Sequence, residues 1–263
     1  MTATDELVSR ADGPAWRLTI NRPARRNALT PELAASLARE IERLGSSDSP
    51  RVILLEGAGG HFSAGLDLRW LTSLGPTPAR AEIRDGLERF QSVILAIVRV
   101  PIPVVALVRG TAAGFGVDLA VACDTRLAGT SATFTSAFSR MGLVPDGGST
   151  YGLPRLIGDG AALRFLLASE TVDAAAALRC GLVDEVVDDA ELDGRAAALA
   201  GALAANAPVS LASIKRLCRT EELSGLERAL RAEGEAQIEA FLGAEFQSRL
   251  AAFLARAGAK ESA

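Results

Sequence analysis

Two short turns rich in glycine and alanine constrain the fold of this chain more than any other feature. The first, residues 62–68, reads FSAGLDL, and the second, residues 110–119, reads GTAAGFGVDL. Each follows an extended apolar run, at 52–55 and at 104–108, and opens into a segment with helical character. Small residues at a strand-to-helix turn let a ligand approach the backbone, and the first N–H groups of a helix have no partner inside it. Two such N–H groups converging on one point would form an oxyanion hole for a carbonyl oxygen that becomes an enolate.

The rest of the chain alternates short apolar runs with amphipathic stretches up to about residue 190, which is typical of an α/β core. We expect strands at 16–20, 51–56, 103–108, 124–128, 133–134 and 183–187, and helices at 31–44, 66–74, 79–98, 115–122, 150–156, 160–167 and 173–178. Thr30 is the expected N-cap of the first helix, and the Gly and Pro residues of 142–149 predict a loop. Residues 201–263 are expected to form a separate helical region after a core at 1–200, with breaks at 206–208 and at Ser224-Gly225.

Composition and charge exclude several classes of function. The formal net charge of the 263 residues is −4, and no block of Lys and Arg stands out, so we expect no nucleic-acid partner. Every apolar run is shorter than a membrane span, and the first ten residues lack the apolar centre of a signal peptide, so a cytoplasmic protein is expected. The single histidine, His61, and three scattered cysteines rule out a multi-histidine or zinc-finger site, and no metal is expected.

Six ordered segments carry a resemblance to a known family. They are NRPARRNAL at 21–29, the two turns, MGLVPDGGS at 141–149 with LPRL at 153–156, ALRCGLVDEV at 177–186, and Ala207-Pro208 followed by Lys215. In this order they resemble the crotonase (enoyl-CoA hydratase/isomerase) family from about residue 15 to residue 220. The resemblance implies an α/β fold built as a spiral of ββα units, with a C-terminal helical trimerisation region that assembles a homotrimer or hexamer. It also implies an acyl-CoA substrate, with coenzyme A as part of the substrate and no other cofactor.

The resemblance also assigns site residues. The thioester carbonyl would lie between the backbone N–H groups of Ala64 and Gly114. Arg25 would reach a phosphate of coenzyme A or else stay solvated. The other positions expected to contact coenzyme A or the acyl group are Ala28, Ser63, Gly65, Leu66, Asp67, Leu68, Phe138 and Pro145.

The residues available for proton transfer depart from the family's hydratases, which use two glutamates. The matching positions hold Asp118 and Phe138. Phe138 cannot transfer a proton, and Asp118 is one methylene shorter than glutamate, which alters its reach. Asp146 lies in the VPDGG loop, where some branches place their only catalytic carboxylate, among them enoyl-CoA isomerases, the epoxyphenylacetyl-CoA isomerase and aryl-CoA dehalogenases. A dry pocket would raise the pKa of such a carboxyl group; candidate walls are Phe115, Phe134, Phe138 and Met141.

Three functions therefore stay open. The first is a double-bond or ring isomerisation with Asp146 as the acid and base. The second is water addition to a 2-enoyl-CoA by Asp118 and Asp146 together, and the third is acyl-CoA binding or scaffolding without catalysis. Asp146 could instead cap a helix, and Asp118 could have a structural role. His61 is either a loop residue or a substrate contact, and a dehalogenase would need it as a base.

Overall fold

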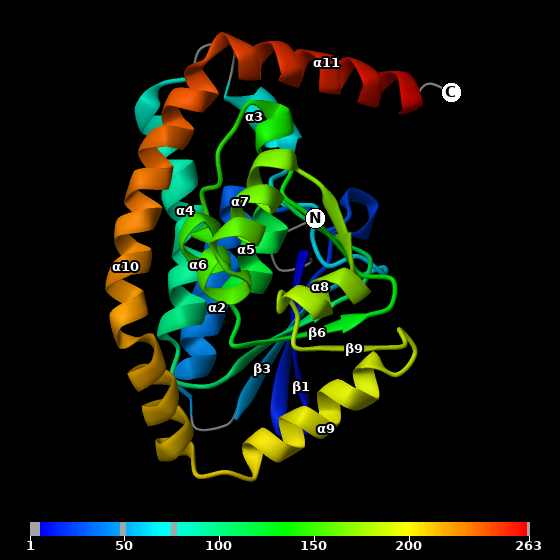
Figure 1. Ribbon diagram of the computed structural model, residues 1–263, viewed down its shortest axis with the longest axis vertical. Coiled ribbons are helices and arrows are strands. Elements are labelled where there is room, and N and C mark those ends of the chain that lie inside the picture. The colour runs from blue at the N-terminus through cyan, green and yellow to red at the C-terminus, as the bar shows by residue number, and fades with distance from the viewer. Residues whose placement is uncertain (1–5, 48–50, 75–77, 262–263) are drawn as a thin grey trace.

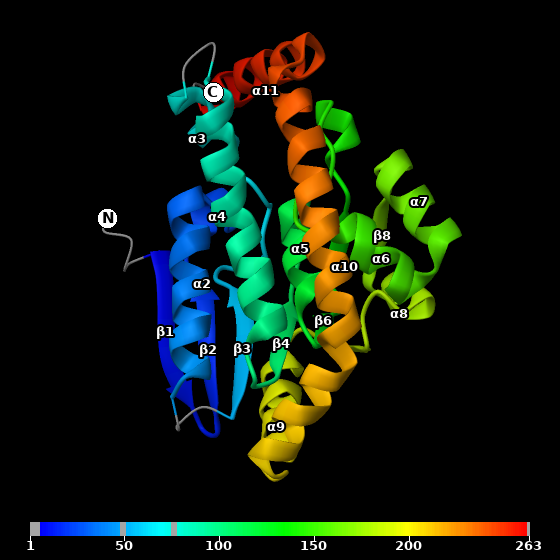
Figure 2. The same cartoon turned by 90° about the vertical axis from the view of Figure 1, so that its left-hand side faces the viewer.

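The computed structural model describes residues 6–47, 51–74 and 78–261. A six-stranded sheet lies at its centre, in the order β1-β2-β3-β4-β6-β9 (Figures 1 and 2). β1 pairs with β2 antiparallel, and the other neighbours are parallel. The strands are β1 (Leu7–Asp12), β2 (Ala15–Ile20), β3 (Val52–Gly57), β4 (Val104–Val108), β6 (Thr125–Gly129) and β9 (Glu185–Val187).

A smaller sheet and its helices complete the core. The sheet has the order β5-β7-β8, from Thr111–Ala113, Thr133–Thr135 and Thr171–Asp173. The helices before residue 190 are α2 (Pro31–Gly45), α3 (Leu68–Ser73), α4 (Arg80–Arg99), α5 (Phe115–Ala122), α6 (Ser149–Ile157), α7 (Asp159–Ala168) and α8 (Ala174–Cys180), with short 3-10 turns η1 (Pro23–Arg25) and η2 (Ser139–Met141).

Every strand and helix expected before residue 190 is present, with ends shifted by two residues at most. Thr30 caps α2, because its side chain accepts a hydrogen bond from Leu33 N. Three strands were not anticipated. β1 is an edge strand with little burial, and β5 and β8 have three residues each, too few to show a period.

The C-terminal part is helical, as expected, but its internal organisation differs. It contains α9 (Leu192–Ala204), α10 (Pro208–Leu242) and α11 (Ala244–Glu261). The expected break at Ser224-Gly225 is wrong, because α10 runs through it. A Cβ atom on Gly225 would lie 2.3 Å from the Tyr151 hydroxyl, so this glycine allows close packing rather than a bend. The expected boundary between residues 200 and 201 falls inside α9.

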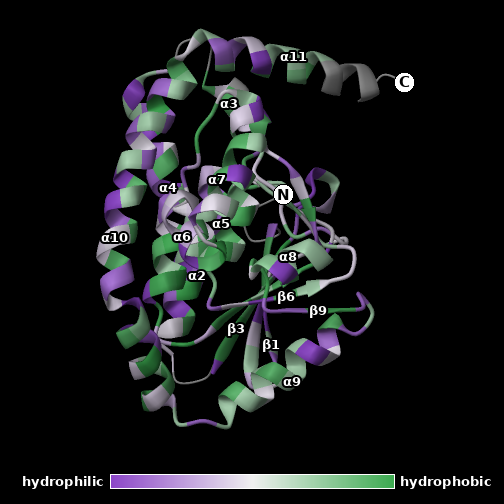
Figure 3. Ribbon diagram, in the orientation of Figure 1, coloured by the Kyte–Doolittle hydropathy of each residue, from purple (hydrophilic) through white to green (hydrophobic). Residues whose placement is uncertain are grey.

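α10 packs along α4 and α6 and reaches from the end of the main sheet to α11 (Figure 2). Hydrophobic and hydrophilic residues mix along its whole length (Figure 3), and its buried side chains include both apolar residues, such as Leu226 and Phe241, and polar ones, such as Gln237. Near its start, the buried Lys215 Nζ lies 2.6 Å from Asp124 Oδ2 and donates to the carbonyls of Ile97 and Ile102. This end of α10 is thereby fixed to the core.

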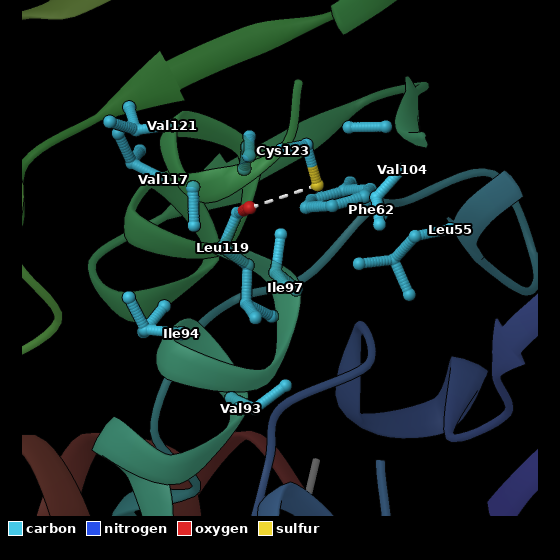
Figure 4. Packing of buried hydrophobic residues seen from close by; sticks show 14 of the residues in the cluster. Leu55, Phe62, Val93, Ile94, Ile97, Val104, Val117, Leu119, Val121 and Cys123 are labelled. Carbon is cyan, nitrogen blue, oxygen red and sulfur yellow. Dashed lines mark hydrogen bonds between the residues drawn. The ribbon is translucent and has the colours of Figure 1, made fainter. Parts of the chain in front are cut away.

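The main hydrophobic core lies between the central sheet and helices α2, α4 and α5. Cys123 belongs to it, as expected of a small buried residue: it is fully buried, and its Sγ lies 3.2 Å from Leu119 O (Figure 4). Burial raises the pKa of its thiol to about 12, so the residue is inert at neutral pH. A second cluster lies under α9, and a third joins α3, α4, α10 and α11.

Within the described residues, no single helix is long and apolar enough to cross a bilayer; α9 and α10 pass that test only as a pair bent by 102°.

Candidate active site

The two glycine-alanine turns lie against each other, as the sequence predicted. β3 and β4 are parallel neighbours, so the turns that follow them start from the same edge of the sheet. Ser63 N donates to Thr111 O at 3.0 Å, and Ala113 N donates to Ser63 O at 2.9 Å. Gly65 has φ +86°, and a Cβ atom there would lie 2.5 Å from Ala113 O and 3.0 Å from the nitrogen of Phe115. Only glycine permits this approach.

The N–H groups that were expected to form the oxyanion hole are occupied within the protein. Ala64 N donates to Arg26 O at 2.8 Å, and Gly114 N donates to Thr135 O at 3.0 Å. The first bond holds the turn to the N-terminal NRPARRNAL segment, and the second continues the pairing of the smaller sheet. Neither amide is therefore available to a ligand, which corrects the assignment of Ala64 and Gly114 as donors.

Two neighbouring amides are available instead. The N–H groups of Leu66 and Phe115 donate to no acceptor among the described residues. Leu66 forms an isolated β-bridge with Leu29, but the N–H of Leu66 takes no part in it. The two hydrogen bonds of the bridge are donated by Leu29 N to Gly65 O and by Asp67 N to Leu29 O. Phe115 is the first residue of α5, a position whose N–H has no partner in the helix. Both positions could have been recognised in the sequence. Leu66 directly follows Gly65, and Phe115 follows Gly114 at the start of the expected helix.

Both residues line an apolar pocket of about 90 Å³. Apart from the Trp70 indole, the polar side chains of its wall are those of Asp146 and Gln237. The sixteen residues of the wall are Ala64, Leu66, Leu68, Trp70, Ile83, Leu87, Phe90, Gly114, Phe115, Ala137, Phe138, Met141, Leu143, Asp146, Gln237 and Phe241. Three of the four expected walls are confirmed, whereas Phe134 is fully buried elsewhere in the core. The sequence did not indicate that α10 contributes Gln237 and Phe241.

Asp146 is the one carboxylate on this wall. It is 5% exposed; its Oδ2 accepts a hydrogen bond from Gln237 Nε2 at 3.1 Å, and its Oδ1 has no partner among the described residues. Burial raises the pKa of Asp146 to about 7; the Gln237 hydrogen bond opposes this rise, and the negative charge of Glu233 adds to it. A carboxyl group with such a pKa can both take and return a proton near neutral pH.

Asp118 lies behind this wall and is not part of the pocket lining. It is 1% exposed and faces Gly147, where a Cβ atom would fall 2.6 Å from Asp118 Oδ2. Burial raises the pKa of Asp118 well above its usual value, and the charges of Asp146 and Glu233 raise it further. Burial of Asp118 thus favours its neutral form over its carboxylate.

Comparison with known proteins identifies the family of this chain. A family model described as enoyl-CoA hydratase/isomerase matches residues 14–260. The chain belongs to this family, the crotonases.

Its relatives include enzymes of more than one reaction. A 1,2-epoxyphenylacetyl-CoA isomerase of Escherichia coli (strain K12) is 36% identical over 82% of each chain, and the enoyl-CoA hydratase EchA19 of Mycobacterium tuberculosis is 34% identical over 83% of this chain and 81% of its own. The crystal structure of an enoyl-CoA hydratase from Bacillus halodurans matches with a TM-score of 0.89 at 29% identity, covering 94% of this chain and 99% of that one. The mixed α/β fold with its helical C-terminal region is thus the crotonase fold.

The other expected binding residues of this crotonase occupy different places. Leu66, Leu68 and Phe138 line the pocket, while Gly65 forms the contact between the turns. Ser63 is buried; its Oγ donates to Asn27 O and accepts from Gly65 N, so its side chain shapes the turn.

Asp67 has an ion-pair partner, since its Oδ2 lies 2.8 Å from Arg22 Nη2. Arg25 is exposed on η1, where its carbonyl accepts from the N–H of the buried Ala28. Pro145 is half-buried beside Asp146 but is not part of the lining. Contacts of Arg25, Ala28, Asp67 and Pro145 with coenzyme A or the acyl group stay predictions.

Two further residues, His61 and Asn27, hold the segments around the turns together by hydrogen bonds. His61 Nδ1 accepts a hydrogen bond from Thr111 N at 3.2 Å, which joins the two turns. Asn27 was missed by the sequence analysis: it is fully buried with φ +57°, and its amide donates to Ala58 O and His61 O and accepts from Arg22 N. No cluster of three His, Cys, Asp or Glu suited to a metal ion occurs in the described part of the chain.

Proposed function

We propose that this crotonase isomerises an acyl-CoA thioester through an enolate, by shifting a double bond or isomerising a ring, with Asp146 as the acid and base. The observation that carries the proposal is the single carboxylate on an apolar wall, with Phe138 at the position of a second one. One carboxyl group is sufficient to remove a proton from one carbon and return it to another.

The two free amides supply the matching electrophilic contact. A thioester carbonyl oxygen placed between Leu66 N–H and Phe115 N–H would gain most from them when it carries the enolate charge. The positive end of the α5 dipole lies at Phe115 and acts in the same direction. Removal of one such donor lowers kcat by about 10²–10³ in a well-studied hydrolase.

The apolar wall favours isomerisation over hydration. Phe90, Phe115, Phe138 and Phe241 all line the cavity, and aromatic walls leave few polar partners for a water molecule. A proton taken by Asp146 is then returned to substrate carbon without competition from bound water. Coenzyme A would lie outside this cavity along residues 63–68, with Arg25 near a phosphate.

The proposal is tested with Asp146→Asn. We expect conversion of a 3-enoyl-CoA to a 2-enoyl-CoA, or of 1,2-epoxyphenylacetyl-CoA to its ring-expanded isomer, to fall by at least about 10³-fold, because Asn cannot accept the proton. Turnover is followed by absorbance and by chromatography of the thioesters. Unchanged turnover on a substrate that the wild type converts defeats the assignment.

Hydration is the second candidate, because relatives such as EchA19 are named enoyl-CoA hydratases. Asp118 would then have to help Asp146 activate water, although it lies outside the lining. Loss of crotonyl-CoA absorbance at ordinary enzyme concentrations would favour hydration. Thioester binding without turnover of any enoyl, epoxy or aryl substrate would favour a binding protein.

We also propose assembly as a homotrimer or hexamer. The first turns of α10 expose three large apolar side chains, Val209, Ile214 and Leu217, which a second copy of the chain could cover.

A further inference from the structure

We propose that Gln237 on α10 is a positioning residue for Asp146: its amide orients the carboxyl group toward the substrate and stabilises the charged form that accepts the proton. The inference rests on the function proposed above, because it gives Asp146 its catalytic role. With this role for Gln237, α10 contributes a functional residue to the site, although it lies far along the chain from both turns.

The hydrogen bonds determine which way the Gln237 amide points. Val144 N donates to Gln237 Oε1 at 3.0 Å, and a backbone N–H can only donate. The carbonyl end of the amide therefore faces Val144, and the NH₂ end must face Asp146. Gln237 Nε2 donates to Asp146 Oδ2 at 3.1 Å, while Oδ1 is left for the substrate. Gln237 itself is 1% exposed, so water does not compete for these bonds.

The loop that bears Asp146 is anchored at every second residue. Gln237 binds Val144, and Gln91 Nε2 from α4 donates to Asp146 O at 3.2 Å and to Leu230 O at 2.8 Å. Glu233, one turn before Gln237 on the same helix face, accepts from Gly148 N at 2.7 Å and from Thr150 N at 3.0 Å. Among these anchors, only Gln237 also touches the reacting carboxyl group.

The charges around Asp146 show why such a donor matters. Glu233 faces it from α10 and Asp118 faces it from α5, and both are acidic. Together with burial, Glu233 disfavours the carboxylate of Asp146. The Gln237 NH₂ group is the side-chain donor that opposes them among the described residues. Without it, Asp146 would be protonated over more of the neutral pH range and less available as a base.

The test compares Gln237→Met with Gln91→Met in the full-length protein. Methionine keeps the length and helix preference of glutamine but removes the amide. We expect Gln237→Met to lower kcat by about 10- to 100-fold and to change KM less than about threefold. The midpoint of the acidic limb of the kcat/KM profile should rise by about one pH unit, because the Asp146 carboxylate loses a hydrogen bond. Gln91→Met removes an anchor of the main chain only and is expected to leave that midpoint in place.

Two results would overturn the inference: a midpoint in Gln237→Met equal to that of the wild type, or the same displacement in both variants. A general loss of stability would affect both variants and is followed by circular dichroism. A third variant, Gln237→Glu, keeps an acceptor for Val144 N–H and adds a negative charge, so the midpoint should again rise.

The inference and the proposed function can fail separately. If Asp146→Asn keeps full turnover, the proposed function is wrong. If Asp146→Asn is inactive but Gln237→Met behaves like the wild type, only the role of Gln237 is wrong. A readout without turnover is the ¹³C carboxyl titration of Asp146 by NMR, whose signal is identified by its absence in Asp146→Asn. Its midpoint should be higher in Gln237→Met, and an unchanged titration contradicts the inference.

Discussion

At the scale of single residues, the site depends on what each main-chain or side-chain group is already bonded to. Ala64 and Gly114 have their amides occupied, whereas the amides of Leu66 and Phe115, one or two positions further along, are free of described partners. Asp146 has one bonded oxygen and one unbonded oxygen. The groups that we propose for catalysis are thus the unpaired ones on the pocket wall, and residue type alone does not reveal them.

Asp146 should destabilise the folded protein at neutral and higher pH. Its pKa is about 7 in the folded chain, compared with ~3.9 for an unfolded aspartate. The folded state therefore favours the neutral acid, and this contribution, complete below about pH 4, is lost as pH rises through about 7. We expect Asp146→Asn to raise the free energy of unfolding at pH 8, by at most about 4 kcal/mol, and to raise it far less at pH 4.5.

Urea unfolding at the two pH values measures this difference. A variant no more stable than the wild type at pH 8 would contradict the raised pKa of Asp146. Higher stability together with lost turnover would be the usual exchange between stability and activity at a catalytic group.

Gly65 should be required for catalysis. In Gly65→Ala, the new methyl group would meet Ala113 O at 2.5 Å and the nitrogen of Phe115 at 3.0 Å, so the turns must separate and the two free amides must move. We expect kcat/KM to fall by about 100-fold or more. Gly60→Ala is the matched control: it also has a positive φ, +82°, but nothing lies within 4 Å of its added Cβ atom. It should show the backbone strain, about 1 kcal/mol, and keep its activity; equal losses in both variants would argue against the close approach.

At the scale of elements, α10 joins parts of the molecule that the sequence separates. One end is fixed to the core by Lys215 and Asp124, and the other carries Glu233 and Gln237 behind the Asp146 loop. Between them, Gly225 lets α10 approach α6 at Tyr151. The helix is therefore a continuous support for the site, because it is not interrupted at Ser224-Gly225.

Gly225→Ala tests the close packing of α10. Alanine normally stabilises a helix interior relative to glycine by about 1 kcal/mol, but here the added methyl group would overlap the Tyr151 ring. We expect a net loss of about 1–3 kcal/mol in the free energy of unfolding. Gly201→Ala, in α9 with nothing within 4 Å, should instead stabilise by up to about 1 kcal/mol. Thermal or urea unfolding of both variants gives the comparison, and a stabilised Gly225→Ala would show that α10 is less tightly packed.

At the scale of the whole molecule, the parallel order of the main sheet creates the site. β3 and β4 are neighbours, so their carboxyl ends and the turns that follow them meet at one edge. α4, α5, the Asp146 loop and α10 then surround that edge, and the cluster of α3, α4, α10 and α11 closes it. The C-terminal helical region expected after residue 200 also contributes to the wall, because Gln237 and Phe241 line the pocket.

The sequence alone determined the local features of this protein. Apolar runs located the strands, and glycine and alanine located the turns, because these signals come from neighbouring residues in the chain. The resemblance of the VPDGG loop to its counterparts in the family indicated Asp146. The tertiary structure decided which amides stay free, that Asp118 lies behind the wall, and that α10 supplies Gln237. These facts depend on hydrogen bonds and packing between segments up to about ninety residues apart, such as the Gln237–Asp146 pair, and no local pattern encodes a partner at that distance.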